Sequence, residues 1–181
     1  MRVKKAVVVV GIVAAVAVMA SAAFAGGSLK TFGESATVTL GKHNSAHIVV
    51  ADGGNGGVYR SASPSKLLKK ANFSFISTGD VQGGAPRWSI AVTTDEDRGT
   101  VEGYAFLDAA GCGAANGDNP LGIATTVSTK KDNCHVNFLG VDYANWKALV
   151  AAFPTARTAD AASFVISDVA GDYNVSRVHF S

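Results

Sequence analysis

The chain has 181 residues, of which 48 % are hydrophobic, and its 16 basic and 14 acidic side chains give a formal net charge of +2 at pH 7. Three of the bases lie within residues 2–5, so the rest of the chain has 13 basic against 14 acidic groups. Without a basic surplus there is no long-range attraction for phosphate backbones, which excludes nucleic acid as a partner.

The N-terminal segment has the three parts of a secretory signal peptide. A basic head at residues 2–5 precedes a small and apolar run that ends in Ala23-Phe24-Ala25. The alternative is an uncleaved membrane anchor, because the run approaches the roughly 20 residues that cross a bilayer. Small residues at its end, with no basic cluster after it, favour cleavage. We therefore predict a signal peptide over residues 1–25, a secreted protein that meets a membrane only before cleavage, and one domain over residues 26–181.

Most of this domain has the pattern of β-strands. Apolar residues alternate with polar ones in short runs that Gly, Asn, Asp and Ser clusters separate. The strand candidates span residues 36–40, 46–51, 72–77, 87–93, 100–108, 135–141, 163–169 and 173–180. About eight strands at this spacing predict an all-β, mainly antiparallel sandwich or barrel.

One segment has helical periodicity instead. Four apolar side chains from Trp146 to Phe153 recur at offsets 0, 3, 4 and 7, which places them on one face of a helix. Asp142 is the predicted N-cap and Pro154 ends the segment. The sequence thus predicts one short helix over about 142–153, with Trp146 as a core plug.

Cys112 and Cys134 are the two cysteines of the chain. An even number in an exported protein predicts one disulfide, whose loop closure is worth on the order of 3 kcal/mol. The alternative is a redox-active or metal-binding pair, but the spacing is far from C-x-x-C.

Two groups of side chains are candidate metal ligands. His43 and His47 have the i, i+4 spacing of a helical zinc site, but in extended chain this spacing spans about 13 Å, and we interpret them as surface histidines. The acidic run at residues 95–97 offers Asp95 and Asp97 as weak calcium candidates, against a charged hairpin turn as the simpler interpretation. We predict no cofactor.

No pattern identifies a catalytic site. The chain has no G-x-S-x-G, so a serine nucleophile elbow is missing. A pair of glycosidase carboxylates has no support beyond the presence of aspartates. A hydrolase of unknown substrate is therefore the third hypothesis, after a glycan-binding or polymer-binding module and a protein-interaction component of the cell envelope.

A candidate ligand site lies around the strand that follows Pro86. The hypothesis combines Arg87 with nearby planar and aromatic groups, because saccharides are bound by planar hydrogen-bonding groups beside apolar ring faces. The tentative ligand residues are Asp80, Arg87, Trp88, Tyr59 and Tyr104.

Each central residue of this hypothesis has a structural alternative that we rank first. Trp88 shares a strand face with other apolar residues, which is typical of a core tryptophan. Arg87 lies on the opposite face and is expected to pair with an acid such as Asp80 or Asp108, holding a loop to the sheet.

Three stretches resemble exported bacterial proteins of uncharacterised role that look like jelly-roll modules. They are residues 73–113, residues 145–154 and the ending at residues 171–180. The resemblance implies an antiparallel β-sandwich of jelly-roll type. Because such modules often bind carbohydrate, it also implies a non-catalytic module for extracellular glycan or another surface polymer. The alternative is a structural or interaction component of the cell envelope with a protein partner.

Overall fold

The computed structural model describes residues 28–60, 65–94, 100–159 and 163–181. The predicted signal peptide up to residue 25 and the calcium candidates Asp95 and Asp97 lie outside these ranges. Over the described ranges, no helix is long and apolar enough to cross a membrane.

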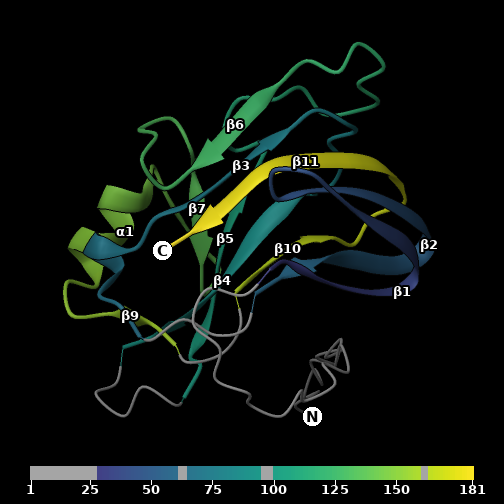
Figure 1. The fold of residues 1–181 in the computed structure, drawn as a ribbon. Helices are drawn as coiled ribbons and strands as arrows, with labels where there is room; N and C mark the ends of the chain where they lie inside the picture. The colour runs from purple at the N-terminus through teal and green to yellow at the C-terminus, as the bar shows by residue number, and fades with distance from the viewer. Residues whose placement is uncertain (1–27, 61–64, 95–99, 160–162) are drawn as a thin grey trace, which may run out of the picture.

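The predicted all-β fold is confirmed, because antiparallel strands make up most of the described chain (Figure 1). One short α-helix, α1 (Trp146–Ala152), and one 3₁₀ turn, η1 (Leu68–Lys70), accompany them. The strands are β1 (Lys30–Gly41), β2 (Ser45–Tyr59), β3 (Phe73–Ser77), β4 (Arg87–Thr93), β5 (Gly103–Asp108), β6 (Thr125–Ser128), β7 (Val136–Phe138), β8 (Val141–Tyr143), β9 (Arg157–Thr158), β10 (Phe164–Ser167) and β11 (Gly171–Phe180).

The strands follow one hydrogen-bonded path in the order β6-β3-β11-β2-β10-β4-β5-β7-β8. In addition, β1 pairs with β2 and β9 pairs with β4. Every pairing in the described chain is antiparallel. β2 is central to this path, since its first half pairs with β11 and its second half with β10.

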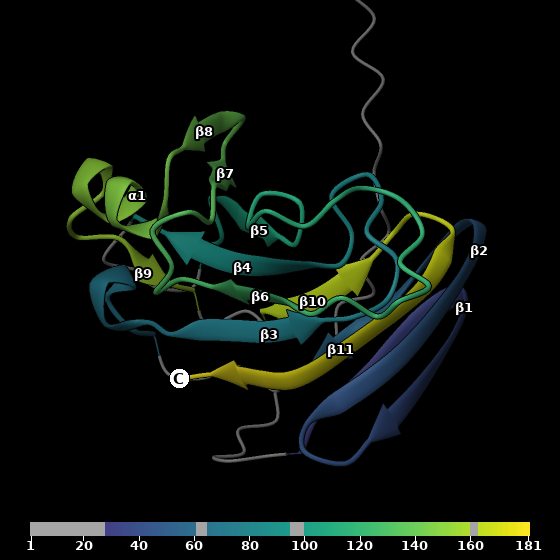
Figure 2. The same cartoon turned by 90° about the horizontal axis from the view of Figure 1, so that it is seen from above.

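The two halves of β2 are separated by an irregular stretch. The pairing with β1 passes from Glu34↔Asn55 to Ala36↔Val50, so residues 51–54 have no register partner there. Gly53 has a φ of 71°, a conformation that glycine adopts without steric cost. Irregularities of this kind let one strand pass from one layer of a sheet to another. The path therefore folds over at β2 into two arms, one holding β11, β3 and β6 and the other holding β10, β4 and β5 (Figure 2).

The two arms meet through aromatic side chains. The Trp88 ring of β4 lies 5.2 Å from Phe73 and 6.4 Å from Phe75 on β3, and 5.3 Å from Phe180 on β11, between ring centroids. Since β4 is a sheet neighbour of neither β3 nor β11, these contacts cross the core. The jelly-roll connectivity implied by the resemblance stays a prediction.

The predicted helix is present but shorter and differently capped. It covers Trp146–Ala152, and the Asn145 side chain accepts a 3.0 Å hydrogen bond from the Ala148 N–H. Asp142 is not the cap, because it lies in β8 and its carboxylate accepts a hydrogen bond from Asn137. Trp146 is a core plug, as predicted, with 5 % of its surface exposed.

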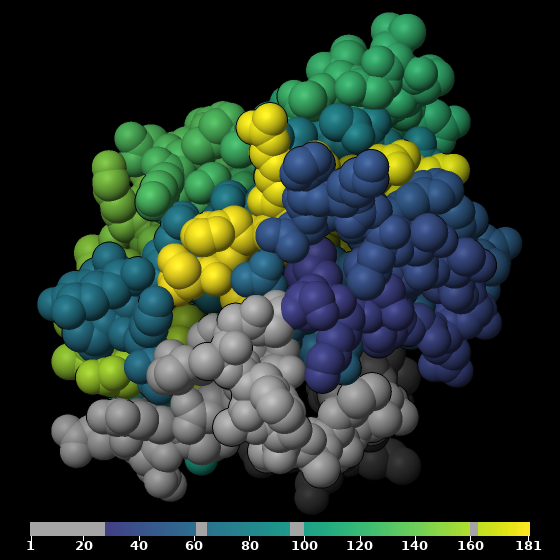
Figure 3. All heavy atoms as spheres, viewed as in Figure 1, coloured from purple at the N-terminus to yellow at the C-terminus, as the bar shows by residue number. Residues whose placement is uncertain are grey.

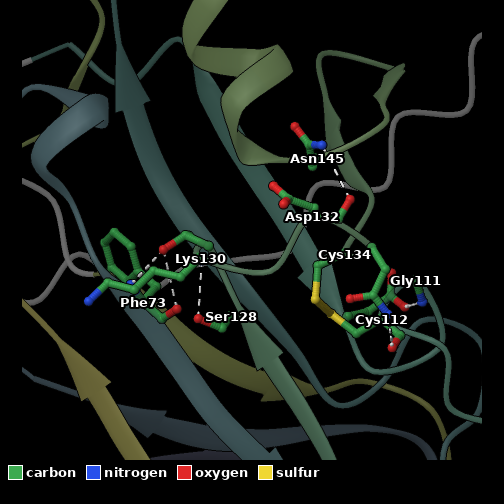
Figure 4. The surroundings of a disulfide bond; sticks show 11 residues. Phe73, Gly111, Cys112, Ser128, Lys130, Asp132, Cys134 and Asn145 are labelled. Atoms are coloured by element: carbon green, nitrogen blue, oxygen red, sulfur yellow. Dashed lines mark hydrogen bonds between the residues drawn. A yellow bond between two sulfur atoms is a disulfide. The ribbon is translucent and has the colours of Figure 1, made fainter.

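The predicted disulfide between Cys112 and Cys134 is present (Figure 4). It links the turn after β5 to the residue two positions before β7, and backbone bonding from His135 N–H to the Gly111 carbonyl runs beside it. The Asn133 amide also donates to the Cys112 carbonyl. The bond therefore closes the long connection of residues 109–135, where few regular strands hold the chain.

Tyr173 of β11 is fully buried and its hydroxyl donates 2.9 Å and 3.3 Å hydrogen bonds to the carbonyls of Val169 and Ala170. The pKa of Tyr173 is raised to about 12, mainly because the phenol is buried and to a lesser extent because of the negative charges of Asp80 and Asp168. The phenol is neutral when folded, so it stabilises the fold fully below pH 10, and this stabilisation is lost as the pH rises from 10 to about 12.

We predict that Tyr173→Phe removes this alkaline sensitivity. The wild type should lose on the order of 2 kcal/mol of unfolding free energy across this pH interval, while the variant loses less. At pH 8 the variant should be the less stable by about 1 kcal/mol, because the partly buried carbonyls of Val169 and Ala170 lose their donor. Urea unfolding at a series of pH values measures both effects. Equal alkaline slopes for the two proteins would contradict the assignment.

Candidate functional site

The structure separates the five tentative ligand residues. Trp88 lies in the core with 0 % of its surface exposed, so it offers no ring to a ligand. The prediction of Trp88 as a ligand residue is wrong, and the alternative of a core tryptophan is correct. Asp80 lies in the loop before β4, and its carboxylate accepts hydrogen bonds from the backbone N–H groups of Asp172 and Asn119, at 2.9 Å and 3.3 Å. Asp80 therefore has a loop-fixing role.

Arg87 has the structural role that we ranked first, but its partner is a different acid. Its guanidinium forms two 2.6 Å hydrogen bonds to the two carboxylate oxygens of Asp168. Neither Asp80 nor Asp108 takes that position, because Asp80 binds backbone N–H groups and Asp108 accepts a hydrogen bond from the Gly111 N–H. The pairing ties β4 to the loop after β10.

Tyr59, Arg87 and Tyr104 lie on the same outer face of the sheet. In the register of β2, β10 and β4, Tyr59 is opposite Phe164, and Phe164 is opposite Ser89. Cross-strand partners point to the same side of a sheet, and residues two apart on one strand do so as well. Arg87 therefore points outward with Ser89, and Tyr104 does so through its neighbour Ala91, which lies two residues after Ser89.

Four rings on this face are in contact across strands that are distant in the sequence. The ring centroids of Phe32 and Tyr59 are 6.2 Å apart, those of Phe32 and Phe164 5.6 Å, and those of Tyr104 and Phe164 5.5 Å. All four side chains are partly buried. We call this set, Phe32, Tyr59, Tyr104 and Phe164, the outer aromatic cluster.

Small residues beneath the cluster let its rings lie close to the sheet. A Cβ added at Gly57 would clash with the Val165 carbonyl oxygen and come within 2.8 Å of the Phe32 ring, so a glycine is required where this ring crosses β2. Ser89 and Ala91 lie between the aromatic residues of β10 and β5 and are themselves buried. The outer face of β4 is therefore covered by rings from its neighbours.

The polar groups at the cluster are neutral or paired. Burial raises the pKa of Tyr104, so its phenol stays protonated and remains a hydrogen-bond donor at neutral pH. Arg87 is neutralised by Asp168, and its guanidinium carbon lies 5.2 Å from the centroid of the Phe106 ring. The face thus combines partly exposed ring surface with planar hydrogen-bonding groups and carries little net charge.

Sequence reasoning missed Phe32, Phe106 and Phe164 as members of this face. Phe32 lies in a stretch that has no clear strand alternation. Phe164 did carry a signal, because it and Ile166 alternate with the buried Val165 and Ser167. Two apolar side chains on the opposite face from a buried valine indicate a strand that is apolar on both sides.

Other titratable groups give weaker arrangements. The His47 Nε2–H donates a 2.7 Å hydrogen bond to the Asp172 carboxylate, and both side chains are exposed. His43 lies in the β1–β2 turn with a φ of 57°, so the two histidines do not share a helix face. Within the described ranges, no group of three or more His, Cys, Asp or Glu side chains could hold a metal ion.

No family model, curated protein or solved structure matches the chain. The assignment of function therefore depends on the geometry of the outer face.

We predict that Arg87 and Asp168 are energetically coupled. A double-mutant cycle with Arg87→Ala and Asp168→Ala, followed by urea unfolding, should give a coupling of about 1 kcal/mol, because the contact is bidentate and partly buried. The exposed pair Lys147 and Asp132, joined at 2.9 Å, is the matched control and should give roughly 0.3 kcal/mol or less. Similar couplings for the two pairs would contradict the special role given to Arg87.

Proposed function

We propose that the protein is a secreted, non-catalytic binding module for an extracellular glycan or another surface polymer. The observation that carries this proposal is the outer aromatic cluster with the adjacent Arg87–Asp168 pair. Rings that keep part of their surface exposed offer apolar faces to the C–H surface of a sugar, while tyrosine hydroxyls and the guanidinium fork offer directional hydrogen bonds.

The shape of the region favours a polymer over an enclosed small molecule. The cluster extends across strands β1, β2, β10 and β5. Two depressions of about 270 and 300 Å³ are lined by other residues, one around the β1–β2 turn and one around Lys66 and Arg157. A sheet face of this kind fits an extended chain lying across several strands.

We predict that Tyr104→Ala and Phe164→Ala each weaken binding to an insoluble polysaccharide by about tenfold, the effect of removing one stacked ring. Binding would be measured by depletion from solution over cellulose, chitin, xylan and peptidoglycan. Tyr143→Ala is the matched control, because Tyr143 is a partly buried tyrosine that packs on Phe153, with ring centroids 6.3 Å apart, away from the cluster.

Circular dichroism and thermal melts of the three variants separate loss of binding from loss of folding. The proposal is wrong if the folded wild type binds none of the four polymers. It is also wrong if Tyr143→Ala weakens binding as much as the two cluster variants do.

A protein partner is the second candidate, and exposed apolar side chains on a fixed loop favour it. Leu121 and Ile123 are 83 % and 65 % exposed. Their turn is held by Asn119, whose side chain donates to the Ile123 carbonyl and accepts from the Ile123 N–H. Exposed apolar side chains on an ordered turn are typical of protein contacts.

We predict that Leu121→Ser combined with Ile123→Ser leaves polysaccharide retention unchanged, since these residues lie outside the cluster. If the function is instead a protein contact, this variant should lose the cross-linked complex that the wild type forms at the cell envelope, while Tyr104→Ala keeps it. Cross-linking in intact cells followed by mass spectrometry measures the complex for each variant. Equal effects of both variants would contradict a protein contact that is specific to the Leu121–Ile123 turn.

A further inference from the structure

β1 is an edge strand of the sheet. It pairs with β2 along its whole length, and in the part of the chain that the structure describes it pairs with nothing else. Figure 2 shows β1 at the outer margin of the sheet, and Figure 3 shows atoms of this segment at the surface. An unpaired edge presents a row of backbone donors and acceptors that another strand can complete.

The first five residues of β1 have a self-complementary charge pattern. Lys30, Phe32 and Glu34 alternate along the strand, so they point to the same face, and Lys30 and Glu34 are exposed. Among the described residues, neither of these two charges has an ion-pair partner. Reading the segment in the opposite direction about Phe32 places each charge opposite its complement.

We propose that two copies of this chain associate through antiparallel pairing of their β1 strands about a twofold axis at Phe32. In this register Lys30 of each copy lies opposite Glu34 of the other. Directly opposite side chains in an antiparallel pair have Cβ atoms about 5 Å apart, which suits an ion pair. A twofold interface uses the same surface on both subunits, so one complementary motif provides two ion pairs.

The backbone limits the pairing to this segment. The register of β1 changes between Glu34 and Ala36, and Ser35 has a φ of 51°. A bulge of this kind bends the edge and ends regular pairing. The regular edge on the N-terminal side of this bulge therefore spans Lys30–Glu34, which is the segment that carries the palindromic charges.

Phe32 at the proposed axis does not obstruct the pairing. Its ring is turned over the backbone of β2 at Gly57, away from the free edge. Because Phe32 also belongs to the outer aromatic cluster, the pairing would place the clusters of the two copies side by side. The second copy would then extend the candidate binding surface, although the pairing itself needs no ligand.

Charge reversal tests the register directly. Sedimentation equilibrium of the purified chain, at concentrations up to about 1 mM because a short interface is weak, should show a monomer–dimer equilibrium. K30E and E34K should each raise the dissociation constant at least about tenfold, because two attractive pairs become two repulsive ones. An equimolar mixture of K30E with E34K should form heterodimers, since every facing pair is then opposite in charge.

A matched control is Lys42→Glu, which reverses an exposed charge in the β1–β2 turn outside the proposed pairing and should leave the dimer unchanged. Thermal melts of the dilute monomers should coincide for all four proteins, because the altered side chains are exposed. A wild type that stays monomeric over the whole concentration range overturns the proposal, and so does a mixture that associates no better than either variant alone. Neither result depends on polysaccharide binding, which is measured separately at low protein concentration.

Discussion

The fold depends on the contact of Trp88 with the aromatic side chains of the opposite arm. The path of strands is continuous, so backbone hydrogen bonds alone would leave it an open sheet. Burial of the Trp88 ring against Phe73, Phe75 and Phe180 brings β4 over β3 and β11 and removes large apolar surfaces from water. The indole N–H of Trp88 has no acceptor among the described residues, a loss that the burial of these rings outweighs.

The same contact explains why the outer face carries rings. β4 directs its largest side chain, that of Trp88, into the core. Its outward-facing residues Ser89 and Ala91 are small. The space above them is filled by Phe164 and Tyr104 from the two neighbouring strands, and Phe32 extends the row over Gly57. The outer aromatic cluster is therefore partly a second, thinner apolar layer of the sheet. Its exposed portion is what remains available to a ligand.

The regular part of this structure could be predicted from the sequence, because alternation and helical offsets are local properties. This applies to the strand pattern and the α1 segment, while the cysteine count and the predicted signal peptide led to the prediction of the disulfide. The start of β1 was missed since an edge strand with two charges shows little apolar alternation. β2 was predicted to end near Ala51 because glycines disfavour strands, yet it resumes after the irregular stretch and continues to Tyr59. Contacts between distant segments have no local signal in the sequence. The predicted partners of Arg87 were Asp80 and Asp108, whereas its observed partner Asp168 lies 81 residues away.

Both tryptophans of the chain are inside it, Trp88 with 0 % and Trp146 with 5 % of their surface exposed. Trp146 donates its indole hydrogen to the Leu68 carbonyl, and Trp88 is enclosed by phenylalanines. Their intrinsic emission therefore senses the interior of the folded protein and shifts when solvent reaches it. A ligand bound at the tyrosines of the outer face would not change this tryptophan emission. The indoles therefore report unfolding well and ligand binding poorly.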